Sequence, residues 1–278
     1  MRIDTHVHVW TDALADPGRR IGAPAVARTD TLDRLRPFAA AAGVDGVVLV
    51  QTIGSELETE QLLGLAAIDP LVVGVVGWAD LAAEDLPERL DRLLSCVGGG
   101  YLAGIRFMVP PIADDFADSP IARGMRAIAD RDLALDLLLT PNRLPDAAAI
   151  VAAVPGLRFV IDHLAKPDIV GNDLGAVRAG LVELARHDAV AVKLSGLLTQ
   201  IDPELQGVED LRPYVDAALD LFGPQRIMLG SDWPLCEPVG GYQLAMSAME
   251  GLAADWAARH KQPLAPDTAG KWYRLQAG

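Results

Sequence analysis

The feature that most constrains the fold of this chain is a regular alternation of short hydrophobic runs with longer amphipathic stretches. Eight of the runs are predicted as strands, at residues 3–8, 46–51, 72–78, 102–107, 134–139, 158–162, 189–194 and 226–230. Several of them, such as Val47-Val48-Leu49-Val50, are almost continuously apolar, which is typical of parallel strands buried on both faces. The sheet is therefore expected to be parallel and covered by helices.

The stretches between these runs have the spacing of amphipathic helices. Apolar residues recur three and four positions apart, as at Leu62, Leu65 and Ala66. Helices are predicted at residues 31–42, 57–68, 86–95, 121–131, 146–153, 174–187 and 210–222. Strict alternation of strands and helices produces right-handed βαβ units, and eight such units in 278 residues match a single (β/α)8 TIM-type barrel domain over residues 1–278.

A doubly wound open sheet is the alternative arrangement of the same elements. Open sheets bind their ligands at one switch point, whereas polar clusters follow nearly every predicted strand of this chain. That distribution favours a barrel, whose active site is built from the loops at the C-terminal ends of all its strands. Two of these loops, residues 11–30 and 195–209, are longer than usual and are candidate lids over the site.

Composition excludes several classes of protein. With 51% hydrophobic and 22% charged residues, the chain is neither disordered nor fibrous. A net charge of −14 argues against nucleic acid or an anionic membrane surface as a partner, and no apolar run reaches the roughly 18–20 residues of a membrane span. Two cysteines and the lack of an apolar N-terminal signal segment favour a cytoplasmic location. A small-molecule substrate is expected, and the number of subunits stays open, a homo-oligomer included.

The placement of histidine is informative because the chain contains only five. Two of them lie together on the first predicted strand, in Asp4-Thr5-His6-Val7-His8. Since side chains alternate along a strand, His6 and His8 point to the same face, toward the mouth of the barrel. Burying two histidines is costly without partners, and such pairs cluster at functional sites. The alternative is a hydrogen-bonded pair that holds a loop in place.

Two later motifs place further polar side chains at this mouth. Asp232 follows the eighth predicted strand in Gly230-Ser231-Asp232-Trp233-Pro234, beside the first strand once the barrel closes. There it can accept a proton from water and return it later, although an N-cap of a following helix is the alternative role. His163 follows the sixth strand, where its ring can reach the centre of the mouth. Asp162 is expected to face the other way and to be structural.

Five other side chains lie at or near predicted strand ends. Arg106 closes the fourth strand and has a planar fork suited to carboxylates and carbonyl groups, with a structural ion pair as the alternative. Lys193 lies deep on the seventh strand and is expected to pair with Asp4 or Asp136. Ser195 is a candidate hydrogen-bonding group at the rim, Lys166 a contact for an anionic or hydroxylated substrate, and Trp78 part of an apolar wall.

The order of these motifs resembles that of the amidohydrolase superfamily. The matching features are an initial Asp-x-His-x-His, a later Asp-His, and a final Gly-Ser-Asp-Trp-Pro at residues 230–234. More narrowly, the chain resembles the branch of sugar-acid lactonases such as L-fuconolactonase and L-rhamnonolactonase, which is related to 2-pyrone-4,6-dicarboxylate lactonase. The resemblance extends over nearly the whole chain, and the ordered set of motifs is far more specific than the histidine pair alone.

The chain departs from that superfamily at two metal-binding positions. Binuclear members use a lysine on the fourth strand and histidines on the fifth and sixth, whereas here the fourth strand ends in Arg106 and the fifth has no histidine. His6, His8 and Asp232 still offer three ligands for one zinc ion. Because the lactonase branch includes metal-independent members, the resemblance implies that no cofactor is required, with a single divalent cation, zinc, as an option.

The resemblance also implies a reaction, the opening of a lactone ester by water. Asp232 would act as the general base and return its proton to the leaving alkoxide, while His6, His8 and His163 polarise the carbonyl group. Arg106 would orient the substrate. The additional arginines of the pyrone-dicarboxylate enzyme are missing, which favours a less anionic substrate such as a sugar-acid lactone. The alternatives are a lactone isomerase and a metal-dependent decarboxylase or another hydrolase of the same superfamily.

Overall fold

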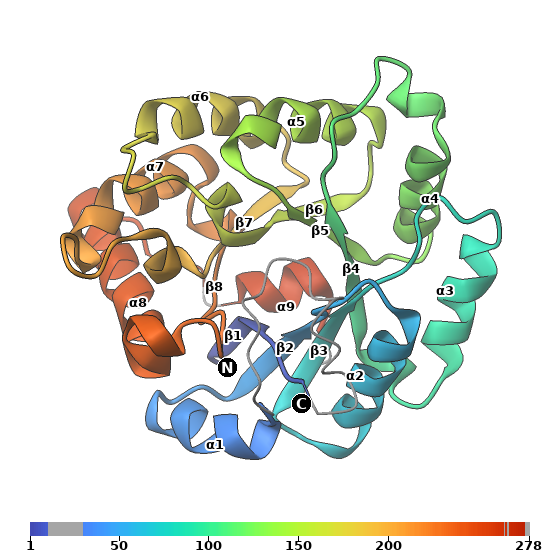
Figure 1. Ribbon diagram of the computed structural model, residues 1–278, viewed down its shortest axis with the longest axis horizontal. Coiled ribbons are helices and arrows are strands. Elements are labelled where there is room, and N and C mark those ends of the chain that lie inside the picture. Colours follow the sequence, from blue (N-terminus) through green and yellow to red (C-terminus); the bar gives the residue numbers. More distant parts are fainter. Residues whose placement is uncertain (11–29, 264, 266, 276–278) are drawn as a thin grey trace.

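The computed structural model describes residues 1–10, 30–263, 265 and 267–275, and its centre is one sheet of eight parallel strands in sequence order. The strands are β1 (Ile3–Val7), β2 (Gly46–Val50), β3 (Val72–Gly77), β4 (Leu102–Met108), β5 (Ala134–Leu138), β6 (Arg158–Ile161), β7 (Val190–Leu194) and β8 (Ile227–Leu229). A bridge between Val7 and Trp233 joins the two edges, so the sheet is a nearly closed barrel with helices around it (Figure 1). The predicted (β/α)8 barrel is confirmed.

The helices follow the strands as predicted. They are α1 (Leu32–Ala41), α2 (Glu56–Ile68), α3 (Leu86–Ser95), α4 (Pro120–Ala129), α5 (Leu144–Ala153), α6 (Leu174–Ala185), α7 (Arg212–Phe222), α8 (Gly241–His260) and α9 (Thr268–Tyr273). Predicted strand ends agree to within one residue and predicted helix ends to within two. Helices α8 and α9 were not predicted. In the described part of the chain, no helix has both the length and the apolar character needed to cross a membrane.

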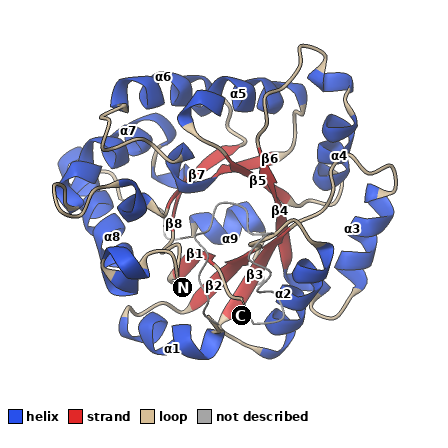
Figure 2. Ribbon diagram, in the orientation of Figure 1, coloured by secondary structure: helices blue, strands red, loops and turns tan. Residues whose placement is uncertain are grey.

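The barrel interior contains an apolar cluster that is separate from the larger core between strands and helices. This cluster consists of apolar side chains from seven strands, namely Val48, Val50, Val76, Ala103, Ala134, Val160, Ala191 and Met228. Helix α9 closes one end of it and contributes Tyr273, and in Figure 2 this helix lies within the ring of strands. Trp272 Nε1 donates to the carbonyl oxygen of Phe159 at the start of β6 (3.2 Å), so the closed end is the N-terminal one. The C-terminal end remains as the mouth.

The seam between β1 and β8 is fastened by backbone and side-chain hydrogen bonds. One carboxylate oxygen of the buried Asp4 accepts from the backbone N–H groups of His6 (3.1 Å) and Ser231 (2.9 Å). The N–H of Asp232 donates to the carbonyl of His6 (2.9 Å), and that of His8 to the carbonyl of Trp233 (2.8 Å). The seam therefore fixes the segment after β8 directly against the histidine strand.

The two predicted lid segments have different outcomes. Residues 11–29 of the first lie outside the described residues. The second, residues 195–209, contains a short 3₁₀ helix at Leu197–Gln200 and the start of another at Val208–Leu211, and its first residues are buried. Whether this segment opens and closes stays a prediction.

Candidate active site

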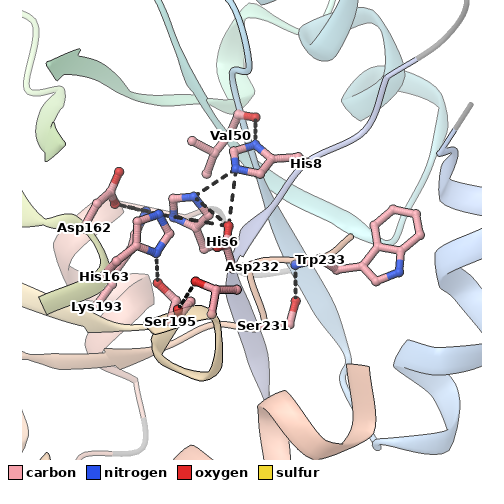
Figure 3. Close-up of polar contacts among 12 residues, drawn as sticks. His6, His8, Val50, Asp162, His163, Lys193, Ser195, Ser231, Asp232 and Trp233 are labelled. Carbon is pink, nitrogen blue, oxygen red and sulfur yellow. Dashed lines mark hydrogen bonds and ion pairs between the residues drawn. The ribbon is translucent and has the colours of Figure 1, made fainter. Parts of the chain in front are cut away.

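Four predicted side chains converge at the mouth of the barrel (Figure 3). The Oδ1 atom of Asp232 lies 3.5 Å from His8 Nε2, 3.7 Å from His6 Nε2 and 4.0 Å from His163 Nε2. The two Nε2 atoms of His6 and His8 are 3.2 Å apart. All four residues are buried, so the cluster is a largely desolvated group of one carboxylate and three imidazoles.

Backbone conformation explains why Asp232 reaches the histidines. His6 near the end of β1 and His8 just after it occupy alternate positions of extended chain, so both point into the mouth, as predicted. Asp232 has a left-handed backbone (φ 58°) and turns back toward them after β8. No helix starts there, since α8 begins only at Gly241, so the alternative role of Asp232 as an N-cap is wrong.

The expected orientation of Asp162 is also wrong. Val160 of β6 lies inside the barrel, and alternation from it places Asp162 inside as well. His163 reaches the mouth for a different reason: the strand ends at Ile161, and four consecutive residues from His163 to Lys166 have left-handed φ values of 50–61°. This turn, and not strand alternation, brings the His163 ring beside Asp232.

Gly196 provides the space in which this cluster packs. Its backbone is left-handed (φ 64°), and a Cβ atom there would lie 2.7 Å from Asp232 Oδ2 and 2.8 Å from His163 Nδ1. Both distances are too short for a Cβ atom, and the left-handed backbone also disfavours other residues. Glycine is therefore required at this position. Sequence reasoning did not single out this residue, although its position directly after Ser195 at the end of β7 was a usable signal.

Beneath the cluster, a group of buried charges occupies the barrel interior. Lys193 Nζ lies 2.6 Å from Asp136 and 3.2 Å from Asp162, which confirms Asp136, and not Asp4, as its main partner. Arg106 Nε donates to Asp162 (2.8 Å), and its Nη1 to the carbonyl of Gln51 (3.2 Å). Arg106 thus forms a structural ion pair with Asp162, the alternative role considered for it in the sequence analysis.

Tyr273 completes this group from the closed end of the barrel. Its hydroxyl lies 2.8 Å from both carboxylate oxygens of Asp136. Burial raises the pKa of Asp136 to about 6, while the charge of Lys193 opposes this shift. Nothing in the sequence indicated that a C-terminal tyrosine would reach a residue 137 positions away.

The three remaining predicted contacts lie around the cluster. Ser195 is deeper than expected: it is fully buried, and its Oγ is 2.9 Å from His163 Nδ1. Lys166 is partly exposed beside Asp232, Arg106 and Asp162, and burial lowers its pKa. Trp78 follows β3, half-buried, with its ring close to Gly54 of the β2–α2 loop. It makes no polar contact with the histidine cluster among the residues described.

Burial controls the charges of the cluster. It lowers the pKa of His163 to about 4 and that of His6 well below the usual value, so both rings are neutral near pH 7. Burial alone would raise the pKa of Asp232, but His163, the contact with His8 and His6 outweigh it and hold that pKa below the usual value. The site therefore combines the ionised Asp232 carboxylate with the neutral imidazoles of His6 and His163.

Neutral imidazole and ionised carboxylate are the forms in which these groups bind metal. Ligand atoms about 2.0–2.1 Å from a tetrahedral zinc ion lie about 3.3–3.4 Å apart. Among His6 Nε2, His8 Nε2 and Asp232 Oδ1 the separations are 3.2, 3.5 and 3.7 Å, and Asp232 Oδ1 is buried without a hydrogen-bond donor among the described residues. These three residues fit one divalent cation, as predicted.

A second group of possible ligands, His6, Asp162 and His163, is less suited to a metal ion. The ammonium group of Lys193 lies 3.3 Å from His6 Nδ1 and 3.2 Å from Asp162 Oδ1. A cationic group of the protein therefore already occupies the neighbourhood of a second ion. This geometry favours one metal position over two.

Comparisons with known proteins agree with the fold and show the family of the chain. The amidohydrolase family model matches residues 3–275. The chain is 38% identical to L-fucono-1,5-lactonase of Burkholderia ambifaria over 248 residues, which cover 87% of this chain and 83% of the relative. It is 35% identical to L-fucono-1,5-lactonase of Burkholderia multivorans, with 99% and 96% covered. A solved amidohydrolase from Burkholderia multivorans with bound zinc is 34% identical and superimposes with a TM-score of 0.85, covering 99% of this chain and 100% of that one.

Proposed function

The chain belongs to the amidohydrolase family, and we propose that it hydrolyses a sugar-acid lactone, with L-fucono-1,5-lactone as the first candidate substrate. The observation that carries this proposal is the ionised Asp232 carboxylate held among three histidines at the mouth of a barrel. Two relatives that match at least 83% of their own length are L-fucono-1,5-lactonases, which supports the same substrate class here.

Asp232 is the proposed general base. Its carboxylate accepts a proton from the attacking water and then returns it to the alkoxide that leaves when the lactone ring opens. A carboxylate with a depressed pKa is a weak base, so the reaction also needs strong activation of the carbonyl group. A divalent cation held by His6, His8 and Asp232 would supply Lewis acidity for this purpose when bound.

His163 supplies an N–H group to the oxygen that becomes negatively charged. Ser195 Oγ can donate to His163 Nδ1, an arrangement that leaves the proton on Nε2, the ring nitrogen that faces Asp232. A donor aimed at the developing oxyanion in a buried site is a strong source of catalysis. Arg106, Lys166 and Trp78 are proposed to orient the hydroxylated ring of the substrate, with Arg106 held in place by Asp162.

The test is a panel of lactones assayed with a pH indicator. It contains L-fucono-1,5-lactone, its five-membered 1,4 isomer, other sugar-acid lactones and 2-pyrone-4,6-dicarboxylate. Hydrolysis releases one acid equivalent per turnover, whereas isomerisation of the lactone releases none. We expect acid release with a sugar-acid lactone. Asp232→Asn is expected to abolish acid release. The control, Asp91→Asn, changes an exposed carboxylate that pairs with Arg131, and it should release acid as the wild type does. Acid release from no member of the panel would refute the proposal.

We also propose that the enzyme works in the cytoplasm and without nucleic acid or membrane partners. The net charge of −14 and the two free cysteines, Cys96 and Cys236, support this location and a small-molecule substrate. Fractionation of cells that express the native protein checks the location, since recovery outside the cytoplasmic fraction contradicts it.

A further inference from the structure

Glu58 of α2 is a fully buried carboxylate, and no lysine or arginine pairs with it among the described residues. Its partners are two neighbouring residues of the β2–α2 loop. The N–H of Thr52 donates to Oε1 (2.9 Å), that of Ile53 donates to Oε2 (2.8 Å), and the hydroxyl of Thr52 also bonds to Oε1. Burial raises the pKa of Glu58, and these three donors oppose that shift. Because burying a carboxylate is costly, its use on one loop requires an explanation.

Capping of α2 does not provide that explanation. The segment Ser55-Glu56-Leu57-Glu58 has the form of a capping box, in which the glutamate accepts from the N–H of the N-cap residue. Ser55 does cap the helix, since its Oγ accepts from the N–H of Glu58 (3.4 Å). The N–H of Ser55, however, donates to the carbonyl of Ile53 (2.9 Å). The carboxylate of Glu58 therefore holds the loop and not the end of the helix.

One peptide unit of this loop connects Glu58 to Arg106. The C=O of Gln51 and the N–H of Thr52 belong to the same planar peptide group. Glu58 accepts from the N–H, and the C=O accepts from Arg106 Nη1 (3.2 Å). The peptide dipole thus has a carboxylate at its N–H end and a guanidinium group at its C=O end, so the two hydrogen bonds strengthen each other. By fixing the plane of this peptide, Glu58 fixes the acceptor of Arg106.

Two anchors determine the direction of the guanidinium group. Arg106 Nε donates to Asp162 (2.8 Å), and Nη1 donates to the carbonyl of Gln51. Nη2 has no hydrogen-bond partner among the described residues. Because the group is planar and rigid, two fixed nitrogens set the position of the third. With the Asp162 contact alone, Nη1 and Nη2 would be free to exchange places by rotation about the Nε–Cζ bond.

We propose that Glu58 is a positioning residue for the substrate contact of Arg106. It holds the peptide between Gln51 and Thr52, so that Nη1 is anchored and Nη2 donates to a hydroxyl or carbonyl oxygen of the lactone. This inference rests on the proposed function, in which Arg106 orients the substrate. Glu58 acts only through the peptide and the guanidinium group, so its substitution should affect activity only while Arg106 is present.

A double-mutant cycle between Glu58 and Arg106 tests this dependence. Glu58→Gln keeps the shape of the side chain, but its NH₂ group faces a loop N–H that then has no acceptor. With Arg106 present, we expect kcat/KM to fall on the order of tenfold with a raised KM, as for the loss of one hydrogen bond to a charged group. In the Arg106→Ala background, the same substitution should change kcat/KM less than about twofold.

The control for the cycle is Ser55→Ala, which removes the cap of the same helix but none of the contacts of the carboxylate. It should lower the stability of the protein and keep the wild-type KM. Equal losses from Glu58→Gln in both Arg106 backgrounds, no loss with Arg106 present, or the same rise of KM in Ser55→Ala would overturn the proposal.

A second measurement needs no substrate and separates this inference from the proposed function. In ¹⁵N spectra of the guanidinium groups, assigned with Arg106→Ala, Nη1 and Nη2 give separate signals when rotation about Nε–Cζ is slow. We expect two signals for Arg106 in the wild type, and their broadening or merging in Glu58→Gln. One averaged signal in the wild type, or unchanged signals in the variant, would contradict the role of Glu58.

The two measurements fail in different ways. A lactone panel without acid release contradicts the proposed function, whereas the guanidinium spectra still decide whether Glu58 positions Arg106. If Glu58→Gln does not fold, Glu58→Asp takes its place in both measurements, because its shorter side chain cannot reach Thr52 and Ile53 in the same geometry. The same losses and the same change of signals are then expected.

Discussion

Replacing Gly196 by alanine should disable the site while leaving the fold almost intact. An alanine Cβ would lie 2.7 Å from Asp232 Oδ2 and 2.8 Å from His163 Nδ1, whereas ordinary contacts begin at 3.4 Å. The carboxylate therefore has to move by about 0.7 Å, and a misplacement of about 1 Å in a catalytic arrangement costs on the order of 100-fold in rate. We expect kcat/KM to fall roughly 30- to 100-fold.

The control for this substitution is Gly43→Ala. Gly43 has nearly the same left-handed backbone (φ 66° against 64°), but an added Cβ would meet only Arg2 Nη1, at 3.4 Å. Both variants are therefore expected to lose about 1–2 kcal/mol of folding stability, because alanine is strained in the left-handed conformation. Only Gly196→Ala disturbs Asp232 and His163. The assays are urea denaturation and steady-state kinetics on the lactone found by the panel. Full activity in Gly196→Ala, or an equal loss in Gly43→Ala, would refute this reasoning.

Three further predictions concern the charges of the site. Asp232→Asn should lower kcat by about 10²–10⁴-fold, with substrate binding retained in calorimetry. Arg106→Ala should lower kcat and also raise KM. A near-wild-type kcat for Asp232→Asn would indicate that a histidine is the general base. Since burial lowers the pKa of His163 to about 4, its protonation favours the unfolded chain, so stability should fall by about 3 kcal/mol as the pH drops from about 6.5 to 4. Urea denaturation across that range should show a smaller loss for His163→Gln, and an equal slope in both proteins would count against a neutral His163. Elemental analysis of the purified enzyme should find no more than one zinc per chain, and two equivalents with activity lost on chelation would show that the metal site has been misread.

Hydrophobic patterning was sufficient to predict the barrel because each parallel strand is buried on both faces and each helix on one. The same patterning predicted the orientation of His6, which lies on β1, and of His8, which follows it directly. It failed for Asp162 because alternation was counted from His163, a residue that lies beyond the strand. The left-handed turn that brings His163 into the mouth has no sequence signal, since none of its four residues is glycine.

Two helices escaped prediction for different physical reasons. Helix α8 begins after Gly240 with no capping side chain, so it lacks the usual start signal. It also contains Gly251, which lowers the helix propensity of its sequence. Helix α9 has six residues, too few for a helical period to show. Because α9 supplies Tyr273, the contact between Tyr273 and Asp136 was also missed. Such a contact depends on closure of the whole barrel, which local patterns do not encode.

The seam between β1 and β8 also affects how the chain folds during its synthesis on the ribosome. Asp4 and Ser231, which join across it, are 227 positions apart. A ribosome that adds about 5–20 residues per second needs about ten to fifty seconds between them. During this interval the nascent first strand has no closing neighbour, and His6 and His8 have no Asp232. Barrel closure and assembly of the catalytic site therefore occur together, late in synthesis. A truncated nascent chain that lacks β8 and the residues after it contains His6 and His8 but not Asp232.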